Sequence, residues 1–271
     1  MQGSAAQAQP HEAKPQQSAT PTQEQQQLAP PAKNQRAGAA TKVPWVPTTA
    51  GLHRIAWDLR ANGPVRWHAG RDFEKGPTAG ALLPPGQYTA KLTIGGQTMT
   101  QKFVVVNDPA SHATQSEMEE RYRATQSVLH EVSQLDVALN RLDAMHDQLQ
   151  SLRMAAKAAG DAKVADKAID SLEKQIKSVE SHITSNPGAE ESTLRLPDQI
   201  REHLTTLDGT LEGEDDAPTP ALLAQVTFLR PEYEAAIRDF NRLLSQDATP
   251  FNRKMEQQGL TGVVAGGQLN P

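Results

Sequence analysis

The stretch LPPGQYTAKLTIGGQTMTQKFVVVNDP (residues 83–109) carries the clearest β pattern in the chain. From 88 to 94, apolar side chains occupy every second position, which is typical of a half-buried strand. Gly95–Gly96 then suits a two-residue turn that needs positive φ angles. The segment 97–106 returns as the partner strand, so the stretch predicts an antiparallel hairpin.

A further strand is expected in GLHRIAWDLR (residues 51–60), where apolar and polar residues alternate again. In this strand Trp57 would face the core, and Asp58 and Arg60 would form a surface ion pair on the opposite face. The sequence therefore predicts a small antiparallel β unit over residues 43–110. Three strands are too few to close a sandwich, so an open sheet of this size needs another layer.

Composition bounds the remaining possibilities. Residues 1–42 are rich in Gln, Ala and Pro and have few large apolar side chains, so we expect a disordered tail. They show no apolar signal-peptide core, and no run in the chain reaches the 18 apolar residues of a membrane helix. The net charge of −5 argues against a nucleic-acid partner, and the absence of cysteine removes thiolate chemistry and disulfides.

A helical pattern begins at residue 114. Thr114 and Glu117 have the spacing of a capping box, and the helix is expected to run to Ala159. Its apolar seam follows a heptad-like spacing. The seam consists of Val128, Val132, Leu135, Leu139, Leu142, His146 and Leu149.

Three more helical stripes follow, at 165–183, 200–211 and 222–244. Gly160–Asp161 separates the first of them from the long helix, and this short connection makes the two helices antiparallel neighbours. Pro231 lies inside the last stripe and should kink or split that helix.

The predicted fold class is therefore α+β. A small Ig-like or FlgD-like β unit is followed by an antiparallel helical bundle over residues 111–248. The remaining residues, 249–271, read as a loose C-terminal tail.

Polar and aromatic side chains converge at one place, the loop between residues 60 and 83. We take five of its residues as candidates for contact with a ligand or a partner: Arg66, Trp67, His68, Arg71 and Asp72. Tryptophan and arginine together can stack on a sugar or form a hot spot for a protein. A loop that closes over its own sheet would use the same residues, and this alternative stays open.

Nothing in the sequence announces a catalytic centre, a cofactor or a metal site. No GxSxG, P-loop, HExxH or dinucleotide-binding glycine motif is present. Asp143 and His146 share a helix face, but they form only half of a di-metal bundle motif. The acidic run around residues 212–216 lacks the spacing of an EF-hand, and a solvated loop is expected there.

The β motifs also carry a resemblance. AGLHRIAWDLR (50–60), the hairpin stretch (83–109) and the helix start ATQSEMEERYRATQSVLHEVSQLDVALNRL (113–142) resemble the C-terminal region of bacterial glycosyl-hydrolase-like proteins with BNR or sortilin-type (VPS10) β-propellers. The resemblance covers roughly residues 44–155. The propeller itself is absent, and with it the residues that carry catalysis in that family. Members are commonly exported, which implies a periplasmic or secreted location, whereas this sequence shows no signal peptide.

Three functional hypotheses follow. The first is a non-catalytic accessory module that docks on a propeller or another protein. The second is a glycoside-binding module or remnant glycosyl hydrolase that works through the Trp67 loop. The third is self-association through the seams at 128–149 and 165–183, as in a coiled coil.

Overall fold

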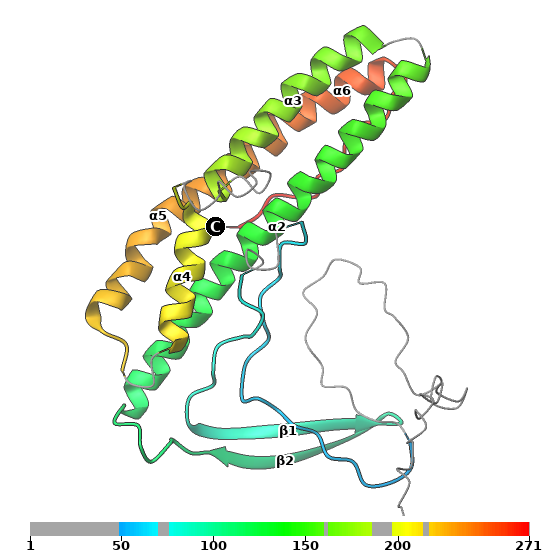
Figure 1. Cartoon of the computed structure of the whole chain (residues 1–271). Helices are drawn as coiled ribbons and strands as arrows, with labels where there is room; N and C mark the ends of the chain where they lie inside the picture. The colour runs from blue at the N-terminus through cyan, green and yellow to red at the C-terminus, as the bar shows by residue number, and fades with distance from the viewer. Residues whose placement is uncertain (1–48, 70–75, 160–161, 186–196, 214–216, 271) are drawn as a thin grey trace, which may run out of the picture. The chain divides into compact units, whose positions relative to one another are not determined.

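The protein is described by a computed structural model (Figure 1). The described residues are 49–69, 76–159, 162–185, 197–213 and 217–270. All of them belong to one unit, Ala39–Pro271. The predicted tail at residues 1–42 lies outside the described part of the chain.

The predicted hairpin is confirmed. Strands β1 (Gly86–Ile94) and β2 (Gln97–Val105) pair antiparallel. Gly95 and Gly96 connect them with φ angles of 56° and 81°, as a hairpin turn without Cβ atoms allows. Within the described residues, this two-stranded sheet is the only sheet.

The strand expected at residues 51–60 is wrong. Only Arg60 pairs in a β manner, through an isolated bridge to Leu82. Leu59 has a φ of 59°, which breaks the extended alternation just before that bridge. Trp57 packs against the rings of Tyr88 and Phe103 at centroid distances of 6.3 and 6.0 Å and stays half-exposed. This segment therefore lies on the hairpin through side chains and adds no third strand.

The long helix is confirmed. Helix α2 spans Gln115–Ala159, with the capping box at its start. The Thr114 backbone N–H donates to Glu117 Oε2 at 2.7 Å, and the Glu117 N–H donates to Thr114 Oγ1 at 3.3 Å. These two bonds satisfy donors that the first helical turn leaves open.

The following helices enclose one apolar core with α2. They are α3 (Ala162–Ile183), α4 (Ile200–Gly213), α5 (Pro220–Arg242) and α6 (Thr249–Gln257). Figure 1 shows α3 beside the C-terminal half of α2 and α4 beside its N-terminal half, and α2 contacts both. The predicted seam on α2 is buried except at His146, where Met145 takes the core position.

Pro231 does not split its helix. Helix α5 continues through it to Arg242, because Pro231 and Thr227 both lie on the exposed face. Water can satisfy the Thr227 carbonyl that the proline leaves without a donor. Leu229 and Tyr233 on the buried face hold the helix against the core.

The end of the chain differs from the loose tail expected at 249–271. Helix α5 passes through a π-helical turn, η2 (Leu243–Ala248), into α6, whose Phe251 and Met255 are buried. Residues 261–270, here called the C-terminal strap, then return in extended form, and Val263 and Leu269 join the core. The strap has no apolar periodicity, so its place in the core could not be predicted from the sequence.

No helix in the described ranges is both long enough and apolar enough to cross a lipid bilayer.

Candidate interaction sites

An extended segment from the predicted contact loop lies along α2. We call residues 65–68 the Trp67 strap. The Val65 N–H donates to Ser133 Oγ at 3.0 Å. Asn140 holds both sides of the strap: its Nδ2 donates to the Arg66 carbonyl, and its Oδ1 accepts from the His68 N–H, each at 2.9 Å. Side chains of one helix face thus replace the strand partner that the strap lacks.

Trp67 is the anchor of this strap, and only 1% of it is exposed. Its backbone N–H donates to Asp136 Oδ2 at 2.9 Å, and its indole Nε1 donates to Asp143 Oδ2 at 2.7 Å. The Arg201 guanidinium lies 5.3 Å from the ring centroid, within cation–π range. The Trp67 strap therefore packs on helix α2 rather than on the sheet, and the Trp67 ring is not open to a sugar or a partner.

A buried ion pair, Asp136–Arg201, contacts both the backbone and the ring of Trp67. Arg201 on α4 donates from Nε to Asp136 Oδ1 at 2.5 Å, and both side chains are nearly inaccessible to water. Burial raises the pKa of the Asp136 carboxyl, whereas the bonds from Arg201 and from the Trp67 N–H lower it. The pair joins α2, α4 and the Trp67 strap at one point.

Of the other four predicted contact residues, the structure describes Arg66 and His68. The Arg66 side chain is half-buried, and the His68 side chain is exposed. Arg71 and Asp72 lie outside the described residues. The structure therefore places one member of the predicted cluster in the core and two at its edge.

Two carboxyl groups, those of Asp208 and Glu212, lie one helical turn apart on α4. Burial and, to a smaller extent, the charge of Glu212 raise the pKa of Asp208 to about 7, and Arg60 offsets part of this rise. Arg60 pairs with Glu212, not with Asp58 as predicted, and also donates to the Gly80 carbonyl at 3.0 Å. Asp208 Oδ1 is buried and has no hydrogen-bond partner. This arrangement ties residues 60 and 80 to α4 and leaves one carboxyl that titrates near neutral pH.

No metal site emerges from the described residues, where no group of three His, Asp or Glu side chains could hold an ion. Asp143 accepts from the Trp67 indole, and burial raises the pKa of its carboxyl. His146 lies half-buried beside it. Of the acidic run at 212–216, only Glu212 and Gly213 are described.

An exposed apolar surface lies on the hairpin. Leu92 on β1 pairs with Met99 on β2, and Ile94 projects from the same face because side chains alternate along a strand. Ile94 is 58% and Met99 56% exposed. At the other end of this face, the Trp57 ring packs against the Tyr88 and Phe103 rings. We call Leu92, Ile94 and Met99 the hairpin patch.

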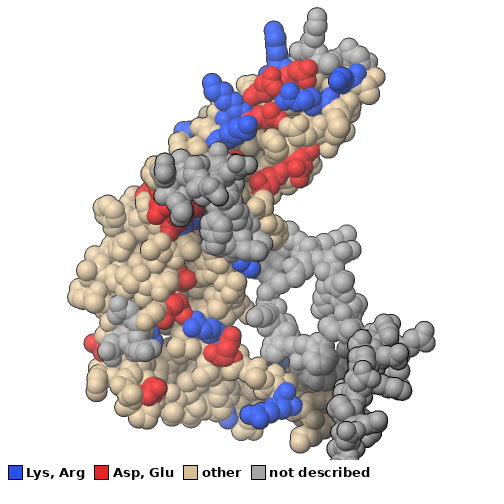
Figure 2. All heavy atoms as spheres, in the orientation of Figure 1, with Lys and Arg blue, Asp and Glu red and all other residues tan. Residues whose placement is uncertain are grey.

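Charged side chains do not form a field of one sign on the face shown in Figure 2. Lysine and arginine alternate with acidic residues over α3 and the adjoining end of α2. Arg153, for example, contacts Asp170 at 2.8 Å and Glu173 at 3.0 Å. This mixture fits a solvated helical surface and does not suggest a polyanion as the ligand.

Comparison of the chain with protein-family models, with curated proteins and with solved structures gave no match. The resemblance to the C-terminal region of BNR or VPS10 propeller proteins therefore stays a prediction.

The residues that hold the Trp67 strap were missed from the sequence. Ser133, Asp136, Asn140 and Asp143 recur at intervals of three and four, which places them on one side of a helix. A polar stripe beside an apolar seam usually indicates a solvated helix face. The short Ser, Asp and Asn side chains of this stripe were the signal that could have indicated a bound backbone segment, because these side chains readily form hydrogen bonds to main-chain groups.

Proposed function

We propose that this chain is a non-catalytic accessory module that docks on a partner protein through the hairpin patch. One observation carries the proposal: a two-stranded sheet exposes Leu92, Ile94 and Met99 together on one face. Isolated two-stranded sheets are marginally stable, and clustered apolar surface of this kind commonly marks an interface.

The partner would supply the layer that the sheet lacks. Strands β1 and β2 pair only with each other among the described residues, so an added strand and its apolar side chains could complete an Ig-like unit. A β-propeller, which the resemblance implies, has strands and apolar edges of this kind. In this proposal the helices form an antiparallel bundle that carries the docking unit.

Two observations favour docking over the other hypotheses. Glycan binding through the loop relied on Trp67, whose ring is buried in the core. Self-association relied on apolar seams that are already buried within one chain.

Photo-crosslinking tests the proposal directly. A photoreactive residue at Ile94 of the full chain should give a protein adduct in extracts of the source cells, whereas one at Thr93, on the opposite face, should not. Adducts from both positions in equal yield, or from neither, would count against docking through this face.

The adduct partner, once purified, allows a matched comparison. Met99→Lys should weaken its binding at least about tenfold, because a charge would be buried at the interface. Thr100→Lys, one position away on the other face, should change affinity less than about twofold. Equal losses in both variants, or turnover of aryl glycosides by the repurified chain, would overturn the proposal.

A further inference from the structure

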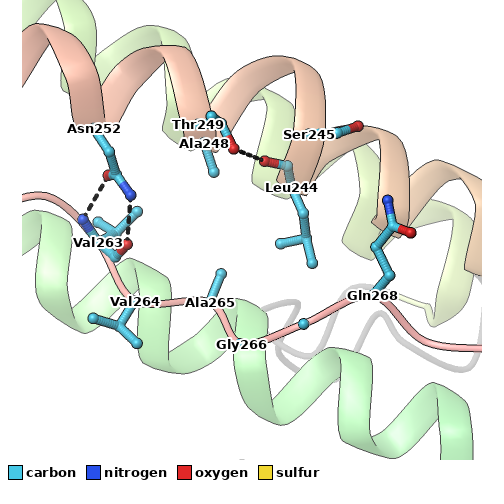
Figure 3. A pocket seen from close by; sticks show the side chains of 11 residues that line it. Leu244, Ser245, Ala248, Thr249, Asn252, Val263, Val264, Ala265, Gly266 and Gln268 are labelled. Atoms are coloured by element: carbon cyan, nitrogen blue, oxygen red, sulfur yellow. Dashed lines mark hydrogen bonds between the residues drawn. The ribbon is translucent and has the colours of Figure 1, made fainter.

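The C-terminal strap is held mainly through its backbone. Asn252 on α6 donates from Nδ2 to the Val263 carbonyl and accepts from the Val263 N–H, both at 2.8 Å (Figure 3). Gln148 on α2 holds Val264 in the same way: its Oε1 accepts from the Val264 N–H at 2.7 Å, and its Nε2 donates to the Val264 carbonyl at 3.1 Å. Each amide thus satisfies both main-chain groups of one residue.

The pattern is repeated at the far end of the strap. Asn241 on α5 donates to the Leu269 carbonyl at 2.8 Å and accepts from its N–H at 2.9 Å. Between the clamps, Arg141 on α2 donates to the Gly267 carbonyl at 2.6 Å. Main-chain groups are the same in every extended peptide, so these clamps do not require this particular sequence.

Side-chain selection is confined to a few positions. Val263 and Leu269 are the buried anchors, six residues apart, whereas Val264 between them is 77% exposed. A Cβ at Gly262 would lie 2.5 Å from the Asn252 side chain. Gly266 has a φ of 76°, and a Cβ there would come within 3.3 Å of the Arg141 guanidinium. The groove therefore fits a Gly-Val-x-x-Gly-x-x-Leu pattern.

Two open depressions lie beside the strap. A hollow of about 550 Å³ remains between the strap and the η2–α6 side, lined by Leu244, Ala248 and Asn252 (Figure 3). A second hollow of about 430 Å³ lies where Thr261 and Gly262 pass α2. A segment with two anchors and unfilled space beside it is expected to open locally without unfolding of the helices.

We propose that this groove, between α2 and the continuous α5–η2–α6 side, is a peptide-binding site, and that residues 262–269 are its tethered ligand. The ligand that displaces the strap is an extended segment of a partner protein with the Gly-Val-x-x-Gly-x-x-Leu pattern. Its backbone is held by Asn252, Gln148 and Asn241, and its two apolar anchors enter the positions of Val263 and Leu269. The strap then acts as an intramolecular competitor that sets the apparent affinity.

The test uses the full chain and a fluorescent peptide with the sequence of residues 259–270. Val263→Asp with Leu269→Asp removes both strap anchors and leaves the groove intact. This variant should bind the peptide at least about tenfold more tightly than the native chain, whose own strap competes. Adding Asn241→Ala and Asn252→Ala should abolish that gain, and a peptide with valine in place of Gly266 should bind at least about tenfold more weakly, since its side chain meets Arg141.

A strap variant that keeps its helical circular dichroism and its cooperative melt but binds no peptide overturns the proposal. So does binding that survives loss of both asparagines. If the strap variant fails to fold, hydrogen exchange of the native chain tests whether the strap opens while the helices stay folded. The Val263, Val264 and Leu269 amides should then exchange at least about tenfold faster than buried α2 amides, and exchange in step with α2 would overturn the proposal. The hairpin patch has no part in this experiment, so its outcome is independent of the docking function.

Discussion

At the scale of single residues, Trp67 shows how a residue suited to ligand contact can serve the core instead. Its ring is buried, its indole N–H is bonded to Asp143, and Arg201 lies over its face. We expect Trp67→Ala to lower the free energy of unfolding by about 3–5 kcal/mol, measured by urea denaturation. Phe228→Ala, a matched aromatic truncation at a 79% exposed position, should stay within about 0.5 kcal/mol of the native chain. Similar losses in both would mean that Trp67 is not an anchor.

Asp208 gives a prediction about pH. Its folded-state pKa is raised from 3.8 to about 7. Between these two pH values, the carboxyl keeps its proton in the folded chain and has lost it in the unfolded chain. The free energy of unfolding should therefore fall as pH rises from about 4 to about 7. Asp208→Asn removes this penalty and should be more stable than the native chain by on the order of 2–4 kcal/mol at pH 8, with the gain vanishing near pH 4.

Thermal or urea unfolding across this pH range checks the Asp208 prediction. The exposed Asp170 on α3 provides a control, because Asp170→Asn should leave the shape of the pH curve nearly unchanged. A constant difference between Asp208→Asn and the native chain at every pH would contradict it.

At the scale of elements, two close-packed backbone segments depend on glycine. Residues 59–63 and 78–83 run side by side, and the Ala61 N–H donates to the Ala81 carbonyl at 2.9 Å. A Cβ on Gly80 would lie 2.2 Å from the Ala61 carbonyl oxygen. Gly80→Ala should therefore cost about 1–3 kcal/mol in chemical denaturation, because the two backbones must separate.

The control for that change lies on α4. A Cβ at Gly209 would meet nothing within 4 Å. Gly209→Ala should raise the free energy of unfolding by roughly 0.5–1 kcal/mol, since alanine favours a helix interior over glycine. A gain at both positions would show that the 59–63 and 78–83 segments are loosely packed.

Much of the element structure follows from the sequence. The hairpin, the capping box of α2 and the limits of α2 to α4 come from local period and turn chemistry, which act within a few residues. The failures have local causes too. The positive φ of Leu59 could not be predicted from the residue pattern. Pro231 is tolerated within α5 because it lies on the exposed face.

At the scale of the whole molecule, the Asp136–Arg201 pair links helices that are far apart in sequence. Arg201→Met would leave the Asp136 carboxylate buried without its ion-pair partner and should cost about 3–5 kcal/mol in stability. Combining it with Asp136→Asn should cost less than the sum of the two single changes, with a coupling of roughly 0.5–3 kcal/mol. A double-mutant cycle by chemical denaturation measures this coupling, and strict additivity would show that the pair is not a unit.

Apolar period, caps and glycine turns are local signals, and from them the hairpin and helices α2 to α5 could be predicted, whereas the strand expected at residues 51–60 is absent and helix α6 was not expected. The sequence by itself could not determine where the extended segments lie. The indole of Trp67 meets a carboxylate 76 residues away, and Leu269 meets an asparagine 28 residues away. Only the tertiary structure decides such contacts, because they depend on side chains that share a helix face and on space left between packed helices. For the same reason the predicted ligand contact Trp67 became core, and the expected loose tail became the occupant of a groove.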